Sequence, residues 1–131
     1  MGDLKGAVSD YNMAIGFEPK LAMPYANRGD TRRADGNVEG AIADLNRSLE
    51  LNPKYAPAYY CRGLAKQLKV DLAGAIADYT RAIELDPKYV AAYNRRGAVK
   101  NATGDMYGAG EDFQRAAELA RQQAAPAKPS P

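Results

Sequence analysis

Three evenly spaced prolines divide this chain into repeats. Pro19, Pro53 and Pro87 lie 34 residues apart, and the sequence around them recurs with the same spacing. The segment AIADLNRSLELNPKYAPAYYCRG, which begins at Ala41, returns as AIADYTRAIELDPKYVAAYNRRG, which begins at Ala75, and most positions are identical. A fixed period of this length is typical of stacked repeats, in which each repeat contacts mainly its neighbours. The pattern favours an extended surface that holds other molecules over a pocket for chemistry.

Each repeat carries the signals of two helices and a short turn. Gly36-Asn37 and Gly104-Asp105, like Gly2-Asp3, place a helix-ending glycine before a residue whose side chain caps the next helix. Asn52-Pro53 and Asp86-Pro87 end the second helix, because the residue before proline avoids the helical region. These signals predict an all-helical chain with no strand and seven helices, near residues 4–17, 22–35, 38–51, 56–69, 72–85, 90–103 and 106–121.

Numbered so that its proline falls at position 32, a repeat has an aromatic residue at position 4 and glycine at 8. Alanine follows at position 20, an aromatic residue or leucine at 24, and alanine or serine at 27. Large residues then face small ones across a helix pair, so the helices can approach closely. This pattern resembles the tetratricopeptide repeat over nearly all of residues 1–123. The resemblance implies a right-handed superhelical solenoid of antiparallel helix pairs, whose concave face binds an extended peptide or a helix of another protein.

The same register predicts how the chain is divided. A half repeat at 1–21 precedes full repeats at 22–55, 56–89 and 90–123, and an Ala/Pro-rich tail at 124–131 is expected to be disordered. Because the half repeat lacks its first helix, the face of Leu4, Val8, Tyr11 and Ile15 has lost part of its cover. Leftover apolar area favours self-association, and a homo-oligomer through the N-terminal half repeat is expected. The alternative is that the chain was cut from a longer array that covers this face.

Two departures from the family pattern are informative. Val70 stands where the other repeats have their mid-repeat glycine, and position 7, usually leucine, is arginine in every full repeat. Such a basic stripe suits either an acidic partner or internal pairing with the aspartate found at position 23. Internal pairing is favoured, because position 7 passes near position 23 in a helix hairpin and a partly buried arginine seeks a bidentate carboxylate. The expected pairs join Arg28, Arg62 and Arg96 to Asp44, Asp78 and Asp112.

The resemblance also implies which residues line the concave face, namely positions 2, 5, 6, 9, 12 and 13 of the first helix. Amides at these positions can hold a peptide backbone, because they donate and accept hydrogen bonds, and a tyrosine gives rigid contact area. The candidate peptide-binding residues are Asn27, Asp30, Tyr60, Leu64, Asn94, Arg95 and Asn101. Some family members clamp a C-terminal carboxylate with Lys, Asn and Arg, but the lysines are absent here, and that specificity is not carried over.

Composition excludes several other functions. The chain has no histidine and one cysteine, so catalysis, a metal site and a cofactor find no support. Its net charge of +2 offers no concentrated basic face for nucleic acid, and no apolar run is long enough for a membrane span. Asp3, Lys5 and Asp10 argue against a signal peptide, so the cytoplasm is expected. We therefore expect a non-enzymatic scaffold that binds a protein or peptide. The alternative is a structural repeat segment that contacts copies of itself or the rest of a longer array.

Overall fold

The computed structural model describes residues 4–17 and 20–124. Within these ranges the chain is all helical, without a strand, as predicted. The seven helices are α1 (Leu4–Phe17), α2 (Ala22–Ala34), α3 (Val38–Leu51), α4 (Ala56–Leu68), α5 (Leu72–Leu85), α6 (Val90–Ala102) and α7 (Met106–Ala124).

The helix ends agree with the prediction to within one residue, except at the end of α7. That helix continues to Ala124 instead of stopping at 121, so the first residue of the expected tail is helical. Position 32 of this repeat is Arg121, and without a proline nothing breaks the helix there. The rest of the expected tail, and the Gly2-Asp3 cap, lie outside the described residues.

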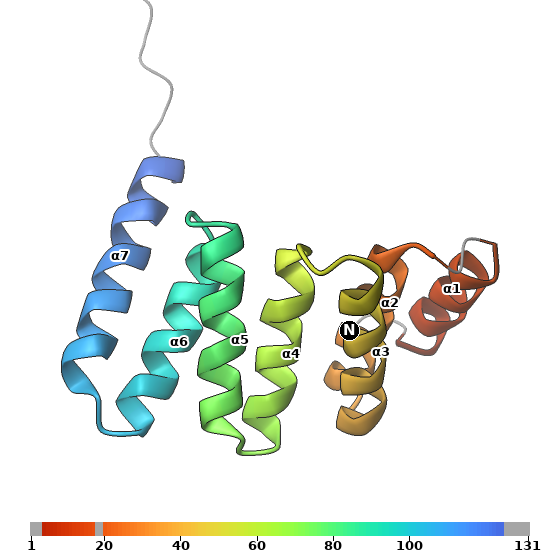
Figure 1. Cartoon of the computed structure of the whole chain (residues 1–131), viewed down its shortest axis with the longest axis horizontal. Helices are drawn as coiled ribbons and strands as arrows, with labels where there is room; N and C mark the ends of the chain where they lie inside the picture. The colour runs from red at the N-terminus through yellow and green to blue at the C-terminus, as the bar shows by residue number, and fades with distance from the viewer. Residues whose placement is uncertain (1–3, 18–19, 125–131) are drawn as a thin grey trace, which may run out of the picture.

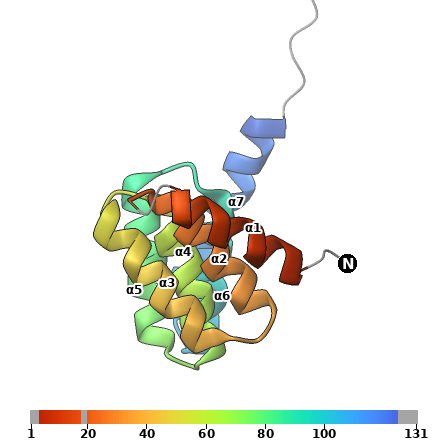
Figure 2. The same cartoon turned by 90° about the vertical axis from the view of Figure 1, so that its right-hand side faces the viewer.

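The helices stand side by side in chain order from α1 to α7 (Figure 1). Within the repeats α2 packs against α3, α4 against α5 and α6 against α7, and between repeats α1 packs against α2, α3 against α4 and α5 against α6. Figure 2 looks along this row and shows α3 and α5 to one side of α2, α4 and α6. The first helices of the full repeats thus form one layer of a solenoid and lie next to one another, with α2 also contacting α4 directly.

Large side chains at position 24 fill the space above glycines at position 8. Leu45 and Tyr79 are completely buried. A Cβ added to Gly29 would stand 2.9 Å from Cγ of Leu45, and one added to Gly63 would stand 2.5 Å from Cε1 of Tyr79. The predicted pairing of large and small residues is confirmed, and it is what allows each hairpin to close tightly.

The turns inside the full repeats share one conformation. Gly36, Val70 and Gly104 all have positive φ, at 86°, 60° and 93°. The next residue then caps the following helix through its side chain: Asn37, Asp71 and Asp105 accept hydrogen bonds from the backbone N–H of Gly40, Gly74 and Gly108 at 3.0, 3.0 and 2.9 Å. The predicted caps are confirmed. Val70 adopts the same left-handed backbone conformation as the two glycines, although its side chain is β-branched.

Candidate binding surface

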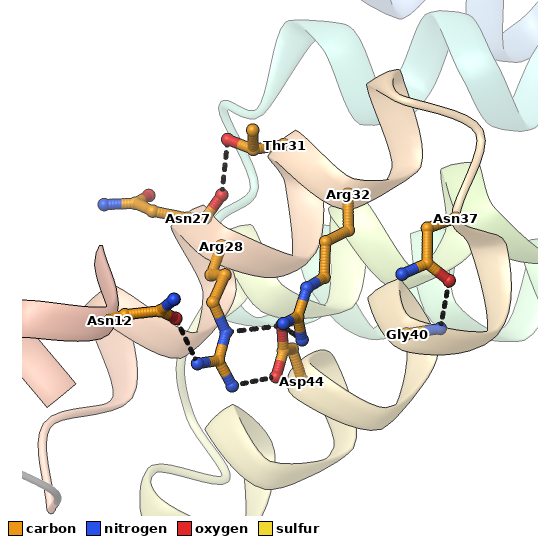
Figure 3. A network of polar contacts seen from close by, with 8 residues as sticks. All are labelled: Asn12, Asn27, Arg28, Thr31, Arg32, Asn37, Gly40 and Asp44. Atoms are coloured by element: carbon orange, nitrogen blue, oxygen red, sulfur yellow. Dashed lines mark hydrogen bonds and ion pairs between the residues drawn. The ribbon is translucent and has the colours of Figure 1, made fainter. Parts of the chain in front are cut away.

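An arginine–aspartate pair joins the two helices of each full repeat. Arg28 donates from Nε to Oδ2 of Asp44 at 2.9 Å and from Nη2 to Oδ1 at 2.6 Å (Figure 3). The same two bonds measure 2.9 and 2.8 Å between Arg62 and Asp78. They measure 2.9 and 2.7 Å between Arg96 and Asp112. All three aspartates are buried, and the predicted internal pairing is confirmed in the full repeats.

The same guanidinium groups also tie each repeat to the one before it. Nη1 of the three arginines donates to a residue at position 25 of the preceding second helix. These acceptors are Asn12 for Arg28 at 2.7 Å, Asn46 for Arg62 at 3.0 Å and Thr80 for Arg96 at 3.2 Å. Each guanidinium further lies over the ring of the tyrosine three residues earlier, 5.6 to 5.7 Å from its centroid. One side chain therefore connects three helices.

Each of these aspartates also forms an ion pair with a second cation. Arg32, Lys66 and Lys100, at position 11, contact the Oδ2 atoms of Asp44, Asp78 and Asp112 at 2.8, 3.0 and 3.3 Å. The hydrogen bond to its aspartate raises the pKa of each position-7 arginine, while burial opposes the rise. The cations of the basic stripe are thus paired with internal carboxylates, and the two cations of each repeat share a single aspartate.

The predicted contact residues on α2 and their surroundings are polar and partly exposed. The Asn27 amide points away from the Arg28–Asp44 pair (Figure 3). Asp30 accepts a hydrogen bond from Nε of Arg33 at 2.9 Å. Across from α2, burial raises the pKa of Cys61 to about 12, and the nearby Asp30 carboxylate contributes to the rise. Cys61 is therefore a protonated thiol at neutral pH and a poor nucleophile.

The predicted contact residues on α4 are partly built into the core. The half-buried Tyr60 ring stacks on Tyr89 with centroids 5.0 Å apart, and it lies 5.8 Å from Tyr79. Leu64 packs against a buried cluster that contains Tyr79 and Val99. Tyr60 stays a candidate for ligand contact, and its neighbours already cover part of its ring.

The predicted residues on α6, Asn94, Arg95 and Asn101, are all exposed. Among the described residues Arg95 has no ion pair. Tyr79 of α5 contacts one of the first helices directly, because its hydroxyl donates to Oε1 of Gln67 on α4. Burial raises the pKa of Tyr79, and the nearby charges of Arg95 and Arg33 oppose that rise. The Tyr79 hydroxyl thus contacts α4 through Gln67, and charges on α2 and α6 act on its pKa.

Sequence reasoning missed Tyr79 and Tyr89, because positions 24 and 34 are packing positions. The available signal was the tyrosine at position 24, where the other full repeats have Leu45 and Phe113. A hydroxyl at a buried position needs a hydrogen-bond partner, and here it reaches Gln67 on a first helix.

The described surface also has a hollow outside the predicted contact set. A hollow of about 500 Å³ lies between α6 and α7, but it shares no residue with the predicted contact set, and most of its lining charges pair with one another. Across residues 4–17 and 20–124, no cluster of His, Cys, Asp and Glu side chains has the arrangement of a metal site. None of the helices described is both long and apolar enough to cross a bilayer.

Comparisons with known proteins agree on the fold. A family model described as TPR repeat matches residues 29–69 and 71–104. A crystal structure of MamA is 26% identical with a TM-score of 0.83 and covers 92% of this chain and 71% of its own. MamA 41-end from Desulfovibrio magneticus RS-1 is 26% identical, with a TM-score of 0.82 and coverage of 95% and 70%.

A third similar structure contains a ligand. The first TPR of Spaghetti (RPAP3), solved bound to the HSP90 peptide SRMEEVD, is 26% identical with a TM-score of 0.73 and covers 75% of this chain and 78% of its own. No curated protein sequence matches the chain significantly.

Proposed function

The chain belongs to the tetratricopeptide-repeat family, and from this premise we propose that the face formed by α2, α4 and α6 binds an extended segment of another protein. The observation that carries the proposal is that the Tyr79 hydroxyl bonds to a polar side chain of one first helix while charges on the other two act on its pKa. Arg33 comes from α2, Gln67 from α4 and Arg95 from α6. A similar fold has been solved with a peptide, which supports this kind of ligand.

The side chains on this face suit a polypeptide better than a reactive small molecule. Asn27, Asn94 and Asn101 offer amides that both donate and accept, as a peptide backbone requires. Arg95 has no internal carboxylate among the described residues, so its charge is available to an acidic group of the ligand. The protonated thiol of Cys61 and the lack of histidine favour binding without catalysis, and the single cysteine favours a cytoplasmic location.

Substitution of the exposed residues on α6 tests the proposal. The proteins captured from the source cell by the unmodified chain are compared with those captured by the Asn94→Ala/Arg95→Ala variant. The segment that binds is then titrated as a synthetic peptide. Because both side chains are exposed, we expect affinity to fall about tenfold or more with an unchanged melting temperature. The matched control is Arg121→Ala/Gln122→Ala, two exposed residues on α7. A ligand indifferent to the α6 changes would overturn the assignment of this face.

A second candidate function is self-association at the ends of the array. Phe113 is 41% exposed, whereas Leu45 and Tyr79 at the same position of the other full repeats are fully buried. At the other end α1 packs against α2, and none of its side chains whose exposure is described is fully buried. Both ends of the array thus offer apolar area, and we propose that this area favours contact between copies, as expected for the N-terminal half repeat. Light scattering over a wide concentration range tests this, and a strict monomer would reject it.

A further inference from the structure

The outer side of α7, where no further helix packs among the described residues, carries exposed apolar side chains. Met106 is 67% exposed, Tyr107 80% and Phe113 41%. Gly110 and Ala117, one turn on either side of Phe113, are also exposed. In α3 and α5 the same side is covered by the first helix of the next repeat, α4 or α6. The outer side of α7 is therefore equivalent to two surfaces that are buried elsewhere in this molecule.

The two covered surfaces show what a covering helix must provide. It brings an arginine whose Nη1 donates to position 25, as Arg62 does to Asn46 and Arg96 to Thr80. It also brings small side chains that become fully buried, such as Ala58 on α4. On α7 the residue at position 25 is Gln114, an exposed amide that can accept the same bond.

A third copy of this interface exists at the other end of the molecule, between α1 and α2. Arg28 of α2 donates to Asn12 at position 25 of α1, as the other arginines do. In this register α1 and α7 are equivalent, so that Tyr11 corresponds to Phe113 and Asn12 to Gln114. The surface of α2 that packs against α1 is therefore equivalent to the surfaces of α4 and α6 that pack against α3 and α5. A second helix such as α7 can pack on a surface of this kind.

Of the two helices, α1 is held less firmly than α7. Among the described residues the principal helix contact of α1 is with α2, and Asp10, its position-23 aspartate, is exposed with no ion pair. By contrast, α7 is held to α6 by the buried Asp112, which Arg96 and Lys100 both contact. An exchange at α2 would replace a weakly supported helix with a firmly supported one.

We propose that α7 of one copy takes the place of α1 on α2 of a second copy, so that chains join head to tail. The proposal specifies the surfaces of the second candidate function and rests on it. Arg28 of the second copy then donates to Gln114 of the first instead of to its own Asn12. The contact between α7 of one copy and α2 of the next repeats the packing seen between α3 and α4 and between α5 and α6. Because its two sides are different surfaces and it does not close on itself, it produces linear chains that lengthen with concentration.

The first experiment asks whether the outer side of α7 is the contact. Sedimentation velocity of the 131-residue chain is compared with that of Phe113→Glu, which we expect to weaken association about tenfold or more, because it places a charge in an apolar contact. The Phe113 ring also lies against Gly97 of α6, so circular dichroism first checks that the variant keeps its fold. The control is Ala77→Glu, which adds the same charge at an exposed site on α5 where α7 has Glu111. Association that persists in Phe113→Glu overturns the proposed surface but leaves self-association itself standing, and a monomer in every variant overturns both.

The second experiment tests the register through a charge exchange. Glu39 at position 18 of α3 contacts Lys69 at position 14 of the next first helix, with 2.8 Å between Oε1 and Nζ. The equivalent pair in the proposed contact is Tyr107 of one copy and Asp35 of the other. Tyr107→Lys should therefore associate about two- to fivefold more tightly than Tyr107→Glu, and the order should reverse when Asp35→Lys is added to both. An order that does not reverse overturns the register. Tyr107 and Asp35 are both exposed, so these variants keep the fold.

The third experiment tests the competition between α1 and α7. Val8→Pro places a proline inside α1, which breaks that helix and frees α2. We expect association to strengthen about tenfold or more, and Phe113→Glu to remove the gain while Ala77→Glu does not. A gain that survives Phe113→Glu would come from nonspecific exposure of α2 and would overturn the proposal. If Val8→Pro does not fold, as judged by circular dichroism, the charge exchange decides the matter.

Discussion

At the scale of single residues, the sequence was most informative where a charge had to be buried. A buried aspartate leaves few arrangements open, because it needs cations and hydrogen-bond donors within reach. The repeated Arg at position 7 and Asp at position 23 could therefore be paired correctly before any geometry was known. Tyr60 had no such constraint, and its stacking on Tyr89 depends on how one repeat is rotated against the next.

Replacement of Asp78 by alanine tests how much a pair stabilises the fold. The change leaves Arg62 and Lys66 without their common carboxylate in a half-buried site, so we expect a loss of about 1–3 kcal/mol in the free energy of unfolding. Urea denaturation followed by circular dichroism measures it. Glu84→Ala is the control, because it removes an exposed carboxylate that lies 3.9 Å from Arg81 and should cost about 0.5 kcal/mol or less. Equal effects of the two changes would show that burial of the pair contributes nothing.

At the scale of helices and turns, local signals located nearly every boundary. Prolines and caps act within a few residues, so the ends of α3 and α5 follow from Asn52-Pro53 and Asp86-Pro87 alone. The end of α7 was placed three residues too early because a repeat without its proline gives no stop signal. The candidate binding surface was only partly predictable for the opposite reason. Its composition follows from the register, but the approach of the Tyr79 hydroxyl to Gln67 depends on how α4 and α5 are placed against each other.

The turn at Val70 should be strained. A left-handed conformation costs a residue with a Cβ about 1–2 kcal/mol, whereas glycine adopts it freely but loses about 0.5–1 kcal/mol more chain entropy on folding. Since Val70 is 75% exposed, its side chain contributes little burial in return. We expect Val70→Gly to raise the free energy of unfolding by about 0.5–1 kcal/mol in urea denaturation.

The reverse change at the equivalent turn is the matched control. Gly36→Val, at φ 86° with open space around the site, should lower stability by about 0.5–1 kcal/mol, because the same two effects act in reverse. A Val70→Gly variant less stable than the unmodified chain would show that the turn carries no strain.

At the scale of the whole molecule, the seven helices are covered unequally. Both α4 and α5 have a packed helix on either side, whereas α1 packs against α2 alone among the principal helix contacts. In a repeat array stability is close to a sum of each repeat and its interfaces, so a helix with one interface opens most easily.

Amide hydrogen exchange should follow this gradient. At a concentration where the chain is monomeric, we expect the amides of α1 to exchange at least about tenfold faster than those of α4 and α5, because opening α1 breaks one interface and leaves the rest intact. Mass spectrometry of peptic fragments measures the difference. Equal protection in α1 and α5 would mean that the whole chain opens as one unit.

The arginine that joins three helices also affects how a repeat protein of this kind can gain or lose repeats in evolution. Its donor at position 7, its carboxylate at position 23 and the acceptor that serves the next repeat at position 25 all lie within one unit of 34 residues. A duplicated or deleted unit therefore brings or removes this whole set of partners, and the new junction again joins an arginine at position 7 to an acceptor at position 25. The arginine contacts thus allow gene duplication to lengthen this protein in whole units. Insertion of a second copy of residues 56–89 after residue 89 should give a longer protein with every junction intact.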